Sequence, residues 1–191
     1  MRFNGSDLIV KGAEILLELA PHVKRIWIIH DKNYPAGTSS MEALDLFASS
    51  NRISLIETHV GSLQELDAIL RARAGSGDIG IDAINIIPDV ITLSPPGFEL
   101  INRFSAEHKL PLVGGAAFAI QKGAVLTTIP DNIEIGRLAA PLADKIFRGI
   151  PAGTIPAVTP EAYLRINYKV IQRLGLKAPE GLLSRADEVI R

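Results

Sequence analysis

The stretch RIWIIH, residues 25–30, is a short run of mainly β-branched and aromatic side chains bounded by polar residues. Its apolar side chains occupy successive positions rather than alternate ones, which is typical of a strand buried on both faces. Polar residues and a proline follow from Asp31 to Gly37, and a helix is predicted from there to about Ser50. This stretch therefore predicts a buried strand followed by a helix.

The same alternation of short apolar strands and amphipathic helices continues along the chain. Further strand-like runs lie at residues 53–59, 83–87, 111–114 and 124–128. Helical patterns follow all of these runs except 111–114, and the longest is at 133–148. Such alternation indicates right-handed βαβ units, and strands that are apolar on both faces need helices on both sides. The sequence therefore predicts an α/β fold, a three-layer parallel sheet flanked by helices.

Length and composition restrict the possible functions. The chain has 191 residues, of which 47% are hydrophobic, enough for one domain with a sizeable core. We interpret residues 1–191 as a single lobe, with residues 150–191 as a C-terminal appendage. Within this appendage residues 162–167 alternate like a strand, and residues 168–174 and 179–191 are predicted as two short helices. Lys and Arg number 20 against 21 Asp and Glu, which gives no electrostatic case for nucleic acid. The absence of cysteine excludes disulfides and thiolate metal ligands.

Targeting signals are absent from the sequence as it stands. No apolar run approaches the ~20 residues of a membrane-spanning helix. Residues 1–7 lack the basic segment and apolar run of a secretory signal. If the chain is the complete gene product, this predicts a cytoplasmic location.

Candidate binding residues follow from the rule that open parallel sheets hold ligands at the carboxyl ends of their strands. The loop after residues 25–30 offers Asp31, Tyr34, Thr38 and Ser39. Thr38 or Ser39 is expected to cap the next helix, where N–H groups and the helix dipole favour a carboxylate or phosphate. A plain N-cap in a solvated turn is an equally good interpretation.

Later loops add four more candidates. Asp89 directly follows an apolar strand and can hold an ammonium group, although such residues often bond local backbone instead. Replacing Asp89 by Ala is expected to abolish binding of an amine ligand while leaving the melting temperature nearly unchanged. Gly114 and Gly115 permit close approach of a ligand to the backbone, or simply a tight turn. Asp131 follows the strand at 124–128.

Signatures of catalysis or of cofactor binding are missing. No Gly-x-Ser-x-Gly elbow, phosphate loop or Gly-x-Gly-x-x-Gly motif occurs. His30 and His59 end adjacent predicted strands and can come near each other, but ordinary strand-end histidines are the stronger interpretation. Trp27 is predicted to be a core residue. We therefore predict no catalytic residue, no metal and no cofactor.

Several segments together resemble one family, the ABC-transporter solute-binding proteins, in the subgroup often linked to tryptophan or other aromatic amino acids. Each segment is weak alone, but their order and spacing are fairly specific and cover nearly the whole chain. They are LAPHVKRI at 19–26, KLPLVG at 109–114, QKGAV at 121–125, IGRLA at 135–139 with ADKIFRG at 143–149, INYK at 166–169 and PEGLLSRADEVI at 179–190.

The resemblance implies one lobe, the C-terminal part, of a two-lobe type I periplasmic-binding fold of flavodoxin-like shape, with ligand held between the lobes. It implies a solute-binding component that binds a small molecule, with an amino acid as a candidate, and a membrane permease as partner. Asp89 would take a ligand ammonium and the Ser39 region a carboxylate. The parent family is periplasmic or extracellular. Two alternatives stay open: a ligand-sensing regulatory domain of a signalling protein, and a small flavodoxin-like α/β enzyme.

The helix predicted at residues 133–148 lies where chains of this type cross back to the first lobe. It carries apolar positions such as Ile135, Leu138 and Phe147. Because an apolar face needs cover, we expect this helix to pack on its own lobe or on a second copy, which makes a homodimer the economical solution.

Overall fold

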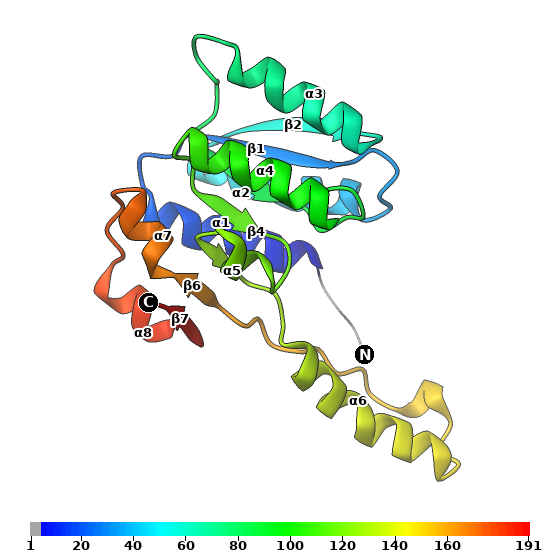
Figure 1. The fold of residues 1–191 in the computed structure, drawn as a ribbon. Helices are drawn as coiled ribbons and strands as arrows, with labels where there is room; N and C mark the ends of the chain where they lie inside the picture. Colours follow the sequence, from blue (N-terminus) through cyan, green and yellow to red (C-terminus); the bar gives the residue numbers. More distant parts are fainter. Residues whose placement is uncertain (1–4) are drawn as a thin grey trace.

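The buried strand predicted from the opening motif is next to one edge of a seven-stranded sheet in the computed structural model, which describes residues 5–191 (Figure 1). The strands are β1 (Arg25–Asp31), β2 (Ser54–Val60), β3 (Ala83–Ile86), β4 (Leu112–Gly114), β5 (Leu126–Thr127), β6 (Arg165–Asn167) and β7 (Glu188–Ile190). The helices are α1 (Gly5–Leu19), α2 (Gly37–Asn51), α3 (Leu63–Ala74), α4 (Pro95–Glu107), α5 (Ala119–Lys122), α6 (Asn132–Phe147), α7 (Tyr168–Arg173) and α8 (Glu180–Arg185), with a 3₁₀ turn at Ala152–Thr154.

The strands lie in the order β2-β1-β3-β4-β5-β6-β7. All pairs from β2 to β5 are parallel, and so is β6 with β7. The pair β5–β6 is antiparallel, with Leu126 opposite Ile166. The predicted α/β sheet is confirmed, with one antiparallel pair where the chain returns from α6.

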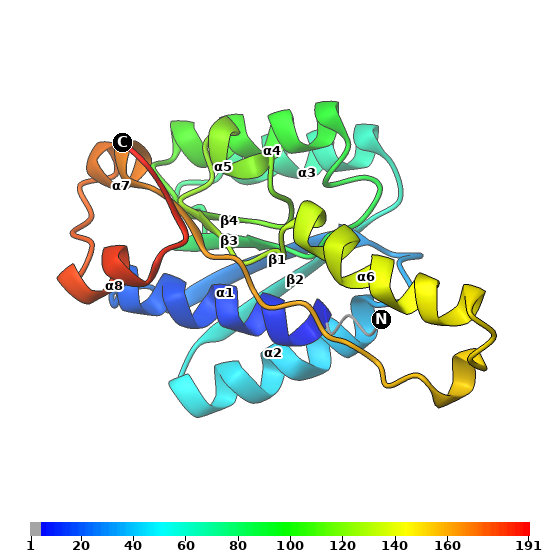
Figure 2. The same ribbon diagram turned by 90° about the horizontal axis from the view of Figure 1, so that it is seen from below.

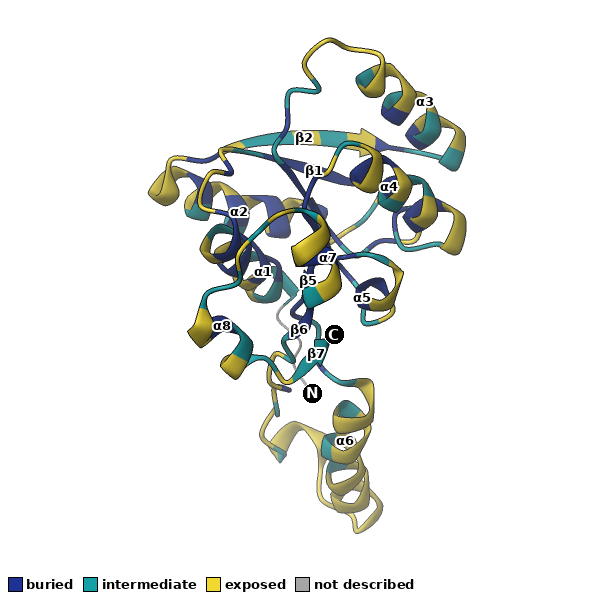
Figure 3. Cartoon of the chain, turned by 60° about the vertical axis from the view of Figure 1, so that its left-hand side comes forward, coloured by how far each residue is buried: buried dark blue, intermediate teal, exposed yellow. Residues whose placement is uncertain are grey.

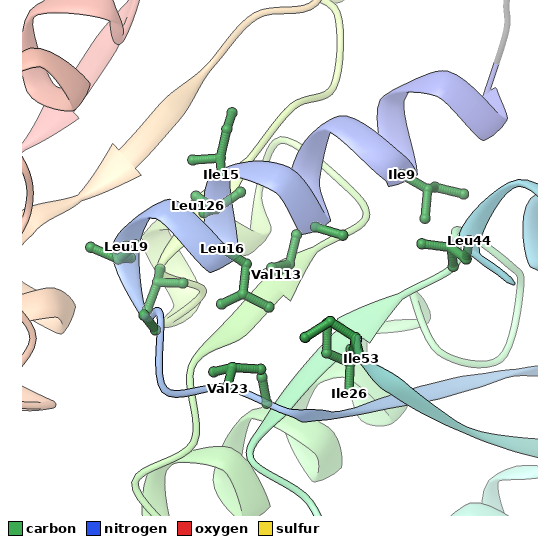
Figure 4. Close-up of a cluster of buried hydrophobic side chains, with 14 of the residues drawn as sticks. Ile9, Ile15, Leu16, Leu19, Val23, Ile26, Leu44, Ile53, Val113 and Leu126 are labelled. Carbon is green, nitrogen blue, oxygen red and sulfur yellow. The ribbon is translucent and has the colours of Figure 1, made fainter. Parts of the chain in front are cut away.

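The two faces of β1 explain the three layers. Ile26 and Ile28 point into a cluster with α1 and α2, whereas Trp27 and Ile29 point into a second cluster with α3 and α4. Figure 2 shows α1 and α2 on one side of the sheet and α3, α4 and α5 on the other. Figure 4 shows how Leu16 of α1 approaches the sheet within the first cluster. Successive apolar residues along this strand therefore serve two cores.

Trp27 is fully buried, as the sequence predicts for a core residue. Its indole N–H donates to the Thr58 hydroxyl at 2.9 Å, and its ring packs edge-on against Phe104. The Arg73 guanidinium lies 4.3 Å from the ring centroid. The indole is thus enclosed by its own fold.

The C-terminal segment extends this sheet rather than standing apart from it. Ile166, Val170, Ile171 and Leu182 join the α1–α2 cluster. The helix expected from residue 179 to the C-terminus ends at Arg185, and β7 follows it. The β-branched Val189 pairs with Ile166 of β6, so sheet pairing overrides the helical reading of the last residues.

Helix α6 does not pack on its own lobe, so the first of the two expected arrangements is not found. It has no buried residue, and Ile133 and Phe147 are 67% and 89% exposed. Figure 3 shows α6 as a largely exposed arm below the sheet. The physical reason is connectivity: the segments on either side of α6 carry it away from the apolar clusters, so its amphipathic face has nothing of this lobe to cover it.

Candidate functional site

The carboxyl ends of four parallel strands form one edge of the sheet. Asp31 is the last residue of β1, and Gly114 is the last residue of β4. Asp89 lies three residues beyond β3, and Asp131 lies four residues beyond β5. Because β1, β3, β4 and β5 run parallel, these loops meet at the same edge, which we call the rim.

Asp89 organises the rim from inside. Its Oδ1 accepts the main-chain N–H groups of Ile91 and Thr92 at 2.7 and 2.8 Å. Its Oδ2 accepts the Thr92 hydroxyl at 2.9 Å and the Asp31 N–H at 3.1 Å. Only 6% of the residue is exposed. These bonds tie the loop after β3 to the end of β1, so removal of the carboxylate is expected to destabilise the fold, unlike the neutral effect expected from sequence.

The first rim loop leads into α2 without a side-chain cap. The N-cap is Ala36, and Thr38 and Ser39 lie within the first turn of the helix rather than before it. Ser39 donates its hydroxyl to the Ala36 carbonyl at 3.2 Å, and both side chains are exposed. Tyr34 is half-buried against the α1–α2 cluster, and Asp31 Oδ1 accepts a main-chain N–H within its own turn. The expected cap is therefore wrong, although both hydroxyls stay at the amino end of a 15-residue helix.

The glycine pair after β4 is explained by close contacts within the protein. A Cβ on Gly114 would lie 2.5 Å from the Ala119 Cβ of α5. A Cβ on Gly115 would lie 3.1 Å from the Ile86 carbonyl of β3. Both positions therefore need glycine for packing, whatever else approaches them.

Arg165 is a functional candidate that sequence analysis missed, and it lies where α6 leaves the sheet. Its side chain is 9% exposed, and its Nε donates to Glu188 at 3.1 Å. Its other nitrogens reach the Ile129 carbonyl at 3.2 Å and the Asp131 carboxylate at 3.5 Å. The guanidinium stacks 4.2 Å from the Tyr163 ring centroid. Arg165 thus links the two segments that carry α6, a contact that no local pattern reveals.

Apolar side chains at the rim were also missed. Val90, next to Asp89, is 79% exposed, and Phe118 at the start of α5 is 43% exposed. Phe118 packs edge-on against Phe98 at 5.2 Å between ring centroids. Beside this pair lies an apolar groove of about 500 Å³ that Leu93 and Pro95 also line. An aromatic residue within the small-residue run GGAAFA was the signal available in the sequence.

Residues 3–190 match the family model of the ABC transporter substrate binding protein. The chain belongs to this family. The family predicted from the sequence motifs is therefore confirmed, and the observed sheet agrees with the predicted fold class.

Known proteins similar to this family member include one curated relative and several solved structures. The tyrosine-binding protein of Clostridioides difficile (strain R20291) is 22% identical over 168 residues, which are 87% of this chain and 47% of that protein. The crystal structure of an ABC domain in complex with L-Trp from Streptococcus pneumonia has a TM-score of 0.80 at 20% identity and covers 99% of this chain. The ligand-free, open structure of a substrate binding protein with adhesive properties from Clostridium difficile has a TM-score of 0.69 at 21% identity and covers 94%.

Length separates this family member from those proteins. The chain spans about half the length of the curated relative, and it covers 61% and 59% of the two solved chains. Within residues 5–191, no helix combines the length and the apolar character needed to cross a membrane.

Electrostatic pKa shifts in this substrate-binding family member concentrate at the opposite, amino edge of the sheet. Burial raises the pKa of Asp82, but hydrogen bonds from the Arg25 side chain and from the N–H groups of Lys24 and Arg25 outweigh it. The net pKa of Asp82 is therefore below its ordinary value. Burial lowers the pKa of Arg73, the arginine over Trp27. The ionised form of Asp82 therefore stabilises the scaffold away from the rim.

Two histidines meet on the first two strands of the sheet. His30 and His59 lie opposite each other in the parallel register, with ring centroids 4.6 Å apart. The proximity that sequence analysis allowed is therefore real. Glu57 lies within hydrogen-bond distance of both rings.

Proposed function

We propose that this chain is a solute-binding lobe of an ABC-transporter substrate-binding protein, and that its rim forms one wall of a cleft for an amino acid with an aromatic side chain. The observation that carries the proposal is the rim itself, where polar loops and exposed apolar side chains meet at one edge of the sheet. The tyrosine-binding relative and the L-Trp complex support an aromatic amino acid as the ligand.

The proposed contacts divide by chemistry. Thr38 and Ser39, exposed at the amino end of α2, would receive the ligand carboxylate, because helix N–H groups and the dipole favour an anion there. The negative charge of Asp89, beside Asp31, would attract the ammonium group. Exposed Val90 would contact the apolar side chain of the ligand.

The remaining rim candidates play supporting parts in this proposal. Gly114 and Gly115 keep the loop after β4 close to the sheet, and Tyr34 packs the first loop against the α1–α2 cluster. Asp131 holds the start of α6 by accepting the N–H groups of Ile133 and Glu134, and so sets where the second wall approaches. No chemical step is assigned to any of these residues.

Half a cleft needs a second wall. Because α6 exposes an apolar face that no other described part of the chain covers, we propose that a second copy packs on α6 and forms a homodimer. Within the whole assembly the partner would be the membrane permease of the transporter, and the site of action periplasmic or extracellular.

Ligand binding is tested by thermal shift and calorimetry with L-Trp and L-Tyr. A bound ligand raises the melting temperature by mass action, so a rise at about 1 mM ligand is expected. Indole-3-propionate, which lacks the ammonium group, and tryptamine, which lacks the carboxylate, should both bind more weakly. The absence of a shift with every proteinogenic amino acid would contradict the proposed function.

The carboxylate contact is tested by placing a like charge on it. Ser39→Glu at the start of α2 should weaken L-Trp binding at least tenfold, because two carboxylates would repel each other. Ser50→Glu, near the other end of the same helix, is the matched control and should bind as the wild type does. Equal affinities of the two variants would remove the start of α2 from the site.

The homodimer is tested by light scattering at roughly tens of micromolar protein. The wild type should show twice the mass of one chain, and Phe147→Asp on α6 should show the mass of a monomer. Leu46→Asp, at a residue that is 74% exposed on α2, is the control and should remain dimeric. A monodisperse wild-type monomer would end the dimer proposal but leave ligand binding to be judged by calorimetry.

A further inference from the structure

Three side chains converge on one face of the β1–β2 pair. In the parallel register His30 lies opposite His59, so their side chains project to the same face. Glu57 is two residues before His59 on β2 and shares that face, because side chains alternate along a strand. The sheet therefore brings the His30 imidazole close to the Glu57 carboxylate, 27 residues later in the chain, and to the His59 imidazole, 29 residues later.

The distances fit a shared cation. Glu57 Oε1 lies 2.8 Å from His30 Nε2 and 3.0 Å from His59 Nε2, and the ligand atoms of the three residues lie within 4.8 Å of one another. A tetrahedral zinc ion with bonds of about 2.0 to 2.1 Å requires ligand atoms about 3.3 Å apart. Small side-chain rotations would bring the observed spacings to that value.

The second ring nitrogen of His30 supports this interpretation. His30 Nδ1 lies 3.1 Å from the main-chain carbonyl of Asp31, which can only accept a hydrogen bond. In a neutral imidazole the single N–H is then on Nδ1, and Nε2 directs a lone pair at the Glu57 carboxylate. A positive charge between these two acceptors, either a metal cation or a second proton on the ring, removes the conflict. A ligating histidine whose other nitrogen donates to a carbonyl is the usual arrangement around protein-bound zinc.

The surroundings hold one ligand firmly and leave the other two accessible. The His30 side chain is 5% exposed, and a Cβ on Gly37 would lie 3.0 Å from its ring, so the first turn of α2 covers it. The Glu57 and His59 side chains are 36% and 54% exposed. A cation can therefore enter from solvent, and water can supply the fourth ligand.

We propose that His30, Glu57 and His59 form a binding site for a divalent transition metal of the Zn²⁺ class. Two nitrogens and one carboxylate oxygen suit Zn²⁺ and its neighbours, whereas Ca²⁺ and Mg²⁺ prefer oxygen ligands throughout. The metal would join the edge strand β2 to β1 near Asp31, the last residue of β1. This site is separate from the proposed solute contacts, and its existence does not depend on them.

The test is calorimetric titration of Zn²⁺ into the full chain prepared without a polyhistidine tag. One Zn²⁺ should bind per chain, and Co²⁺ in its place should give the intense visible absorption of a tetrahedral centre. His59→Ala and Glu57→Gln should each weaken Zn²⁺ binding by about tenfold or more. Both change exposed side chains, so loss of folding does not confuse the result.

His22→Ala is the matched control, because His22 is an exposed histidine that precedes β1, whereas His30 lies near the carboxyl end of that strand. It should bind Zn²⁺ as the wild type does. The proposal is overturned if Zn²⁺ does not bind. It is also overturned if His59→Ala and Glu57→Gln bind as tightly as His22→Ala, which would mean adventitious surface binding only.

Discussion

Helices α1 and α6 have similar lengths, 15 and 16 residues, and both are amphipathic, yet they differ in how much of their apolar face is buried. Helix α1 buries Ile15, Leu16 and other apolar residues against the sheet, whereas α6 buries none. Both helices fulfil the same sequence rule, that apolar residues recur along one face. The comparison teaches that periodicity identifies a face to be covered but not what covers it.

The largest effect should distinguish the buried helix from the exposed one. Leu16→Ala removes a fully buried side chain and should lower the free energy of unfolding by about 2 to 5 kcal/mol. Phe147→Ala should change it by less than about 0.5 kcal/mol in the single chain, because Phe147 is 89% exposed. Urea unfolding at a dilution that favours monomers measures both. A large loss in Phe147→Ala would show that α6 packs on the sheet after all.

Two aspartates give the next comparison. Asp89→Ala removes an acceptor of four hydrogen bonds and should cost about 1 to 3 kcal/mol. Asp144→Ala in α6 breaks one exposed pair with Arg148 and should cost at most about 0.5 kcal/mol. Thermal unfolding of the ligand-free variants compares them. If Asp89→Ala leaves the melting temperature unchanged, Asp89 does not organise the rim.

Two glycines should respond with opposite signs. Gly114→Ala places a Cβ 2.5 Å from the Ala119 Cβ and should destabilise the sheet by about 1 to 3 kcal/mol. Gly136→Ala in α6 meets nothing within 4 Å and should stabilise that helix by about 0.5 to 1 kcal/mol, because alanine favours helix. Urea unfolding measures the first and helical circular dichroism the second. A loss of helix in Gly136→Ala would mean that α6 contacts something at that residue.

The smallest effect should appear only in acid. The pKa of Asp82 is lowered in the folded chain, so its ionised form stabilises the sheet. That contribution is complete above the ordinary aspartate value of about 3.9 and disappears as the pH falls through the lower folded value. Asp82→Asn should therefore flatten the loss of stability below about pH 4. Unfolding midpoints measured across this range test it, and parallel curves for variant and wild type would contradict it.

Local pattern was enough for most of the sheet but not for its last strand. The runs that became β1 to β5 are apolar and bounded by turn residues, so their existence follows from sequence alone. Strand β7 was predicted as helix because Val189 and Ile190 show no local preference strong enough to outweigh the preceding helical pattern. Its pairing with β6 is a contact between residues more than 20 apart along the chain.

The candidate site divides in the same way. Asp31 and Asp89 could be placed at one rim because parallel strands end together, a rule that needs only strand order along the chain. The hydrogen bond between them, the stacking of Arg165 on Tyr163 and the shared contact of His30 and His59 with Glu57 could not be foreseen. Each depends on strand register or on the path of α6, which local periodicity does not contain.

Sequence by itself determined the α/β class, the family and the edge of the sheet where polar loops gather, because these follow from apolar runs, turn residues and ordered motifs. Only the tertiary structure decided that α6 leaves the lobe, that the Asp89 carboxylate accepts hydrogen bonds from its own loop and that two histidines contact one carboxylate. The physical reason is range: propensity and periodicity act over a few residues, whereas burial, register and side-chain convergence are set by contacts between distant segments.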